Sequence, residues 1–528
     1  MSSALSSHGK LYDDGDLRSP LVSREANPKK ITMDEMLEKY CGDFGLWQMR
    51  HLVLTCLAWL LEGILTMVMI FADREPAWHY LTSHAGTMSR CSSEPGSWEW
   101  SGGNGSSTMS EFGLICGDKF KVGLVQSIFF AGCMIGAGVF GHLSDTKFGR
   151  KGSLTIICIL NAIFSILTAF SPDYWTYVLF RFLSGFSTGG TGLCAFVLST
   201  EPVGQSWRGV AGMSTLYLYS TGIVVVSAIA YFIQPWRSLY IASSIPSLIF
   251  VIFVLPFLHE SPRWYLVRGK VDEAMKIMQK IAVSNGKQNI PYDVVLALDS
   301  EVSKDDIPNS QFNTKKAING SILDVIRSPV TRIRLFVAVA TNFFCSIVYY
   351  GLSLNAVNLG TNLYLNVALN SVSEMPAYLL TSLVLDRIGR KPLAIGTMWF
   401  SAIFCLVGSF LKSTDETWKI VRMVCGLLGI FGISGTFNLL LVYGMELFPT
   451  VVRNAALGCS KQAVSLGAIL APIIVVLGGG VPFAVFGACG IIGGFLVMYL
   501  PETLNKPLYD TMDGLQEAEA KPGLVALD

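Results

Sequence analysis

The stretch Gly141-His142-Leu143-Ser144-Asp145-Thr146-Lys147-Phe148-Gly149-Arg150-Lys151 separates two long apolar runs, at residues 122–143 and 153–171. Its charged residues occur a second time about 240 residues further on, where Asp386 corresponds to Asp145 and Arg390-Lys391 corresponds to Arg150-Lys151. The second copy also lies between two apolar runs, at 361–385 and 392–411. The repeated stretch indicates that the two halves of the chain are built alike.

Further charged residues recur at nearly the same offset. They are Arg181 and Arg422, Glu201 and Glu446, Arg208 and Arg453, and Glu260 and Glu502. An ordered set of this kind indicates a duplication, so we expect two bundles of helices. Parallel repeats related by an axis along the membrane normal build two-bundle transporters, which hold substrate near the midplane.

The composition is that of a membrane protein. Of the 528 residues, 51% are hydrophobic and only 15% are charged, whereas soluble proteins carry about 25% charged residues. The mean hydropathy of +0.49 excludes an ordinary soluble enzyme. The net charge of +1 gives no reason to expect a nucleic-acid partner.

Twelve apolar runs approach the length of about 20 residues that a membrane-spanning helix requires. They lie at roughly 51–72, 122–143, 153–171, 175–200, 208–233, 237–258, 334–355, 361–385, 392–411, 419–445, 455–478 and 480–500. They lack the alternation that a membrane β-barrel requires. The predicted fold is an all-α membrane protein with twelve transmembrane helices in two six-helix bundles.

Lys and Arg residues gather on one side of these spans, in the short turns around Lys147 and Arg387 and in the segment between the bundles. Because positive residues stay in the cytosol, both termini are predicted to be cytosolic. The chain then divides into a cytosolic N-terminal tail (1–50), a first bundle (51–258) with an outer loop (73–121), a cytosolic linker (259–333), a second bundle (334–500) and a cytosolic C-terminal tail (501–528).

The outer loop contains two signals typical of an oxidising compartment. Asn104-Gly105-Ser106 is a glycosylation sequon on the side where glycans are added. Cys91 and Cys116 are the only cysteines of this loop, so a disulfide between them is possible.

The repeated charges, apart from Arg181 and Arg422, fall at cytosolic helix ends, where carboxylates and guanidinium groups can pair across neighbouring helices. We expect them to form a gating network that is paired when the inner gate is shut and separated when it opens. The alternative is that they only orient the spans and cap helices. The network comprises Asp145, Arg150, Glu201, Arg208, Glu260, Asp386, Arg390, Glu446, Arg453 and Glu502.

The opening stretch resembles the loop 2–3 signature of the major facilitator superfamily. Three further strings are similar to those of the organic cation/carnitine transporters, particularly their plant branch: Ser110-Glu111-Phe112-Gly113-Leu114-Ile115-Cys116, Glu374-Met375-Pro376-Ala377-Tyr378, and Glu446-Leu447-Phe448-Pro449-Thr450-Val451-Val452-Arg453-Asn454. The span at 334–355 lacks the Gln-Gln-x-x-Gly-x-Asn pattern of sugar porters. The resemblance implies a carrier of small organic ions.

Two carboxylates lie near the middle of predicted spans, where a charged group is costly and therefore a candidate for function. The resemblance implies that Glu374 attracts a substrate cation. Glu62 does not belong to a family motif. It either binds a substrate or a proton, or it makes a structural hydrogen bond. Aromatic faces attract quaternary ammonium groups, and the resemblance places Tyr349 and Tyr219 at positions where family members have aromatic residues.

The chain also departs from the family. The resemblance places Ser465 where animal cation transporters carry Asp and anion or carnitine members carry Arg. It places Asn342 and Gly192 where animal cation transporters carry Trp. The cavity is therefore expected to differ in shape, and substrate preference cannot be transferred.

The predicted function is secondary active or facilitative transport of small organic cations or zwitterions, such as carnitine, choline or polyamines, by alternating access. The alternative is transport of a sugar or an organic anion. A coupled proton is possible, no cofactor is expected, and no enzyme motif is present. Residues 16–22 resemble a degenerate acidic dileucine signal, which leaves the vacuolar membrane and the plasma membrane as alternatives.

Overall fold

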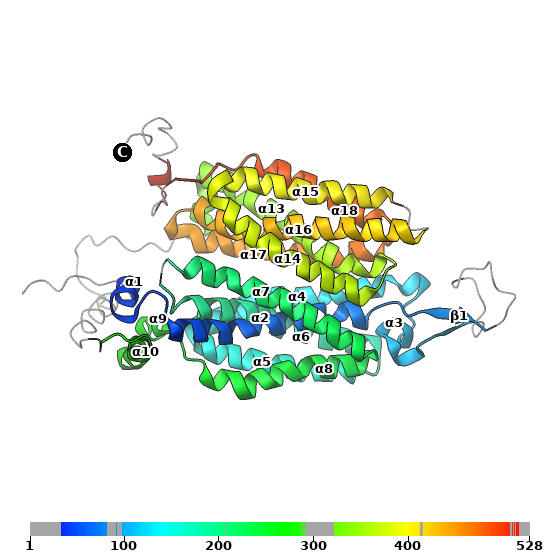
Figure 1. Cartoon of the computed structure of the whole chain (residues 1–528), viewed down its shortest axis with the longest axis horizontal. Coiled ribbons are helices and arrows are strands. Elements are labelled where there is room, and N and C mark those ends of the chain that lie inside the picture. Colours follow the sequence, from blue (N-terminus) through cyan, green and yellow to red (C-terminus); the bar gives the residue numbers. More distant parts are fainter. Residues whose placement is uncertain are drawn as a thin grey trace, which may run out of the picture.

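The computed structural model describes residues 33–81, 91, 98–204, 206–288, 290, 322–411, 415–506, 509, 512 and 514–516. The long helices form two groups of six that lie side by side (Figure 1). The first group contains α2 (Leu46–Ala72), α4 (Phe120–Thr146), α5 (Gly149–Ala169), α6 (Tyr174–Thr200), α7 (Arg208–Phe232) and α8 (Trp236–Ile249). The second contains α13 (Pro329–Leu354), α14 (Leu363–Ile388), α15 (Arg390–Phe410), α16 (Glu416–Leu447), α17 (Thr450–Val476) and α18 (Val481–Val497).

Ten of these described helices are long and apolar enough to cross a membrane. The other two are α18, which has 17 residues, and α14, which contains Glu374 and Pro376. The twelve helices correspond to the twelve predicted apolar runs, and the prediction of an all-α membrane protein is confirmed. Helix ends differ by a few residues: α2 begins at Leu46 rather than at 51, because the helix continues through a turn in which Gln48 and Arg50 interrupt the apolar run. The predicted sorting signal at 16–22 lies outside the described residues.

Glycine residues let α4 and α6 approach until their backbones touch. A Cβ atom added at Gly136 would collide with the backbone oxygen of Phe186, and one added at Gly189 would collide with that of Cys133. Helices in lipid gain no hydrophobic driving force from meeting each other, so close backbone packing at small residues contributes much of their association.

One end of the molecule, called the linker end below, carries short helices from the segment before α2 and from the chain that follows α8 (Figure 1). The apolar side chains of the N-terminal helical turns are buried against those of α10, and Nδ2 of Asn285 donates to the carbonyl oxygen of Cys41 at 2.8 Å. This packing was not predicted, because the first 50 residues were expected to form a polar tail. The short elements are α1 (Met33–Met36), the π-helical turn η1 (Leu37–Cys41), α9 (Pro262–Val267), α10 (Val271–Ser284) and α12 (Ile322–Arg327).

The opposite end, called the hairpin end, carries the loop between α2 and α4 (Figure 1). Cys91 and Cys116 are joined there by a disulfide, with their Cα atoms 5.7 Å apart. Asn104, the predicted glycosylation site, is exposed in a 3-10 turn. The loop also contains an antiparallel hairpin of β1 (Trp78–Tyr80) and β2 (Trp98–Trp100), followed by α3 (Thr108–Glu111).

Polar contacts hold this loop on the first helix group. Glu111 of α3 accepts hydrogen bonds from Arg237 at 2.5 Å and from Nε1 of Trp236 at 2.6 Å, both at the start of α8. Oγ1 of Thr108 donates to the buried carboxylate of Asp73, directly after α2, at 2.7 Å. The loop is therefore fixed to the outer ends of α2 and α8.

The two groups meet along two seams, α4 against α17 and α7 against α14. Toward the hairpin end, Oγ of Ser127 donates to the carbonyl oxygen of Ile469 at 2.6 Å, and Oγ of Ser227 donates to that of Tyr364 at 2.6 Å. These bonds join the groups on both sides of the central axis.

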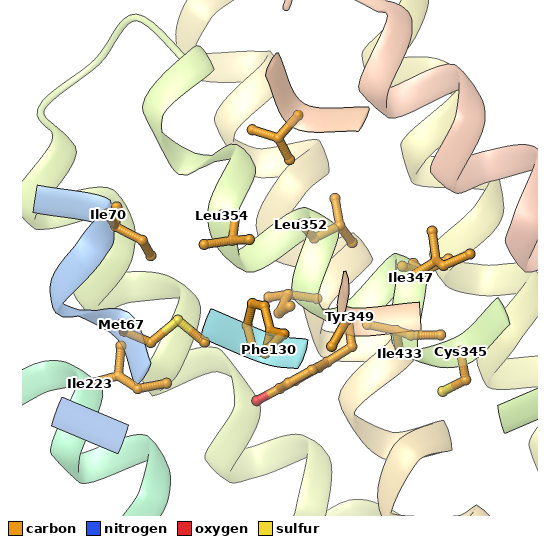
Figure 2. Close-up of a cluster of buried hydrophobic side chains, with 14 of the residues drawn as sticks. Met67, Ile70, Phe130, Ile223, Cys345, Ile347, Tyr349, Leu352, Leu354 and Ile433 are labelled. Carbon is orange, nitrogen blue, oxygen red and sulfur yellow. The ribbon is translucent and has the colours of Figure 1, made fainter. Parts of the chain in front are cut away.

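Apolar side chains from both groups pack together at the same depth, and the ring centroids of Phe130 and Tyr350 lie 5.0 Å apart. These side chains are buried, so the two groups are in direct contact toward the hairpin end. The labelled residues of this layer are Met67, Ile70, Phe130 and Ile223 from the first group and Tyr349, Leu352 and Leu354 from the second (Figure 2).

We predict that Gly136→Ala destabilises the protein by about 1–3 kcal/mol, because the added methyl group overpacks the α4–α6 contact. The matched control is Gly138→Ala in the same helix, where a Cβ atom meets nothing within 4 Å. Thermal unfolding of the detergent-purified proteins measures both. Equal unfolding temperatures for the two variants would contradict the role assigned to the backbone contact.

Candidate functional site

Glu374 lies on α14 at the seam with α7, and 1% of its surface is exposed. Its Oε2 accepts hydrogen bonds from Oγ of Ser220 at 2.6 Å, from the hydroxyl of Tyr378 at 3.1 Å and from the hydroxyl of Tyr349 at 3.3 Å. Ser220 belongs to α7, so one donor comes from the other helix group. A buried carboxylate is costly unless donors or a cation compensate it, and three hydroxyl groups do so here.

Tyrosine rings surround this carboxylate. The ring of Tyr349 stacks on Phe437 with centroids 5.1 Å apart, and Tyr378 meets Tyr217 edge to face at 5.8 Å. The hydroxyl of Tyr219 on α7 is buried and has no hydrogen-bond partner among the described residues. A carboxylate enclosed by aromatic rings is suited to an organic cation, since the ring faces attract positive charge.

Glu62 lies near the middle of α2 in the first group, where its Oε2 is buried without a hydrogen-bond partner among the described residues. It occupies space left by Gly192 of α6, because a Cβ atom there would collide with this oxygen. Lys461 of α17 is the charged side chain that acts on it from the second group. Tyr350 follows Tyr349, and the centroids of their two rings lie 5.2 Å apart.

Two predicted site residues, Asn342 and Ser465, form hydrogen bonds with the backbone of their own helices. Nδ2 of Asn342 donates to the carbonyl oxygen of Ala338 at 2.8 Å, and Oγ of Ser465 donates to that of Lys461 at 3.2 Å. The structure therefore joins Tyr349 to Glu374 by a hydrogen bond but shows no such bond from Asn342 or Ser465 within its described part.

Two residues of the site were missed from the sequence. Tyr378 lies four residues after Glu374, a spacing that places both on one helix face, so this signal was available. Ser220 carried no signal, because nothing in a single serine of α7 indicates a partner in α14.

A cavity of about 500 Å³ lies between α4 and α17 toward the linker end. Its walls are α4 between Met134 and Leu143 and, on α17, Gln462. No group of His, Cys, Asp and Glu residues that could hold a metal ion occurs in the part of the chain that the structure describes.

The repeated charges form two equivalent chains of ion pairs at the linker end. In the first group, Arg150 binds Asp145 at 3.1 Å and Glu201 at 3.2 Å. In the second group, Arg390 binds the corresponding carboxylates, Asp386 at 3.1 Å and Glu446 at 2.9 Å. Each chain joins three neighbouring helices of one group. The gating role of these pairs stays a prediction.

A glutamate caps the helix that follows each repeated stretch. Glu260 accepts hydrogen bonds from the first two backbone N–H groups after Gly149, at 2.9 and 3.0 Å, and Glu502 accepts from the corresponding two after Gly389, at 3.0 Å each. Both glycines have positive φ, 75° and 99°, and a Cβ atom on either would crowd the carboxylate. A negative charge at a helix N-terminus is stabilising, so these two residues fix the starts of α5 and α15.

The two remaining members of the predicted network, Arg208 and Arg453, bond to backbone. Arg208 donates to the carbonyl oxygen of Val203 at 3.1 Å, and Nε of Arg453 donates to that of Phe448 at 3.3 Å. Each acceptor lies five residues before its arginine, so the repeat extends to these side chains as well.

The pKa of Glu502 is lowered although its partial burial favours the neutral form, because backbone N–H groups of Leu504, Arg390, Lys391 and Thr503 donate to the carboxylate. A group whose pKa falls on folding stabilises the folded state above its unfolded pKa and loses this effect as the pH falls through its folded pKa. The cap is therefore intact at neutral pH.

The relatives of the chain are transporters. A family model described as "Sugar (and other) transporter" matches residues 63–513. The chain is 62% identical over 513 residues to organic cation/carnitine transporter 4 of Arabidopsis thaliana, covering 96% of both proteins. It is 35% identical over 421 residues to the organic cation transporter protein of Drosophila melanogaster, covering 79% of this chain and 75% of that protein. The chain belongs to the organic cation/carnitine transporter family of the major facilitator superfamily, as its motifs predicted.

Solved structures of the same fold include the xylose transporter XylE from E. coli in a partially occluded inward-open conformation. It has a TM-score of 0.64 and 19% identity, covering 88% of this chain and 100% of that one. XylE is also described as a proton:xylose symporter, in a structure with a TM-score of 0.59 and 19% identity that covers 89% of this chain and 99% of that one. The protein is thus a multi-pass transmembrane transporter and not an enzyme.

We predict that Glu201→Gln opens the linker end more than Asp145→Asn does. In Glu201→Gln, Arg150 loses a carboxylate partner that is 17% exposed. In Asp145→Asn it loses a partner that is 69% exposed, and exposed ion pairs contribute little to holding helices together. A cysteine introduced at Gln462 should react with a maleimide supplied from the linker end about two- to five-fold faster in Glu201→Gln. Glu416→Gln, which removes an exposed pair with Lys419, is the control. Unchanged labelling with normal transport would remove the gating role.

Proposed function

We propose that the protein carries small organic cations or zwitterions by alternating access, with Glu374 as the residue that binds the positive group. The observation that carries this proposal is the buried carboxylate of Glu374, which lies between the two helix groups and among tyrosine rings. The names of the relatives, organic cation and carnitine transporters, support the same substrate class.

The position of Glu374 suits a carrier because hydroxyl donors from both helix groups compensate its buried charge. Tyr349 and Tyr378 belong to the second group and Ser220 belongs to the first. A rocking motion that separates α7 from α14 removes the serine donor. A bound ammonium group replaces it and compensates the carboxylate through a charge-assisted interaction, which is stronger than a neutral hydrogen bond.

Of the alternative substrates, an organic anion is disfavoured, since an anion would be repelled by Glu374 in a region of low dielectric constant. A sugar is uncharged, and its hydroxyl groups could bond to a carboxylate. The fold shared with a xylose transporter keeps sugar as the substrate to be compared directly.

The proposed orientation places the linker end in the cytosol, following the distribution of Lys and Arg. The cavity then opens to the cytosol and the apolar layer lies on the other side. The hairpin end, with exposed Asn104 and the Cys91–Cys116 disulfide, then faces the extracellular space or an organelle lumen. Either a membrane potential or a proton gradient could drive transport.

We predict that wild-type protein in proteoliposomes takes up labelled carnitine, choline or putrescine and that Glu374→Gln reduces this uptake about ten-fold or more, because a hydrogen bond to a charged group is lost. Labelled glucose tests the sugar alternative in the same vesicles. A potassium-diffusion potential and a pH gradient, imposed separately, identify the driving force.

The control variant is Glu416→Gln, which removes an exposed carboxylate paired with Lys419 and should leave uptake close to wild type. Robust cation uptake by Glu374→Gln would make Glu374 a structural acid. Uptake of glucose alone by well-folded protein would replace the proposed substrate class.

A further inference from the structure

The first helix group contains a carboxylate that the protein itself does not compensate by hydrogen bonds. Buried Asp73 accepts hydrogen bonds from Thr108, Tyr177 and Gln126, at 2.7, 2.8 and 3.2 Å, and Glu374 accepts three from hydroxyl groups. The residue Glu62 is only partly buried, but its Oε2 atom is buried and has no such donor among the described residues. A structural acid would be expected to have donors, so Glu62 is suited to an external partner.

The fold makes room for Glu62 at one position. Gly192 of α6 faces its Oε2 so closely that any side chain there would displace the carboxylate. The glycine does not serve a backbone contact, unlike Gly189, whose added Cβ atom would collide with the backbone of Cys133. The small residue at 192 therefore clears space for an acidic group in the middle of the molecule.

Glu62 and Glu374 lie close to the same part of α7. A Cβ atom added at Gly63, directly after Glu62, would collide with the backbone oxygen of Tyr219. Ser220, directly after Tyr219, donates to Glu374 at 2.6 Å. A ligand that touches both acids would bridge the groups.

Lys461 indicates the chemistry of the partner. Its ammonium group acts on Glu62 from α17, next to Gln462 at the cavity wall, and the residue is exposed. A lysine side chain is a primary ammonium group on a flexible four-carbon stem. The charge of Lys461 acts on Glu62 but makes no hydrogen bond to its Oε2 in the described part of the chain, so the carboxylate is available to the ammonium group of a ligand.

We propose that Glu62 forms a second cation subsite, so that the carrier selects linear organic dications, such as alkyl diamines and polyamines, over monocations. One ammonium group binds Glu374 and the other binds Glu62, while the methylene chain lies along the tyrosine rings. This inference rests on the proposed function, because it requires Glu374 to bind a cation.

The test compares putrescine and choline as a dication and a monocation in the same proteoliposomes. We expect Glu62→Gln to raise the KM for putrescine about ten-fold or more, since a contact with a charged group is lost, and to leave the KM for choline within about two-fold of wild type. Glu374→Gln should impair both substrates.

Two further variants test the geometry without removing the acid. Gly192→Ala should displace the Glu62 carboxylate and reproduce the selective loss of putrescine transport, whereas Gly396→Ala, where a Cβ atom meets nothing within 4 Å, should not. Lys461→Gln should lower the KM for putrescine, because it removes the competing ammonium group. The rise in unfolding temperature caused by each ligand gives a second readout for any variant too weak to assay.

The outcomes separate this inference from the proposed function. Wild-type transport of choline without binding or transport of putrescine would overturn the dication subsite and leave the proposed function standing. The dication subsite would also be overturned if Glu62→Gln impaired the transport of both substrates equally, or of neither. Wild-type protein that transports and binds neither cation would overturn the proposed function, and the subsite with it.

Discussion

A carboxylate buried where two bodies meet has to be compensated in every arrangement that the bodies adopt, because an unpaired buried charge is among the costliest groups in a protein. Glu374 is in this position: two of its hydroxyl donors move with it and the third, Ser220, belongs to the opposite group. The relative position of α7 and α14 therefore decides whether the hydrogen bond from Ser220 to Glu374 forms. The apolar layer toward the hairpin end and the cavity toward the linker end define the state in which this bond is formed.

Much of the fold could be predicted because charges are rare in so apolar a chain. Those at helix ends recur with a spacing set by the length of six spans, so Arg150 and Arg390 identified the two halves, and the structure places them in equivalent ion-pair chains. Within the site, Glu374 and Tyr349 were predicted from their depth and from family motifs. Ser220, 154 residues from Glu374, could not be predicted, because its partner is defined only by the packing of the two groups.

At the linker end, too, contacts between distant segments could not be predicted from the sequence. The segment before α2 is too polar to indicate a core, and its few apolar residues become informative only beside α10, where Asn285 bonds to the chain at Cys41. Asp73 was overlooked for a related reason: it ends a predicted span, where an acidic residue is ordinary, and its burial depends on Thr108 from the loop and Tyr177 from α6. Contacts between distant segments decide both cases.

The attachment of the loop at the hairpin end has a practical consequence. Its described polar contacts run from Glu111 to the start of α8 and from Thr108 to the end of α2, and a disulfide closes it on itself. An antibody fragment raised against this loop would travel as one rigid body with α2 and α8. It would serve as a marker of orientation in electron micrographs and identify the first helix group within each particle.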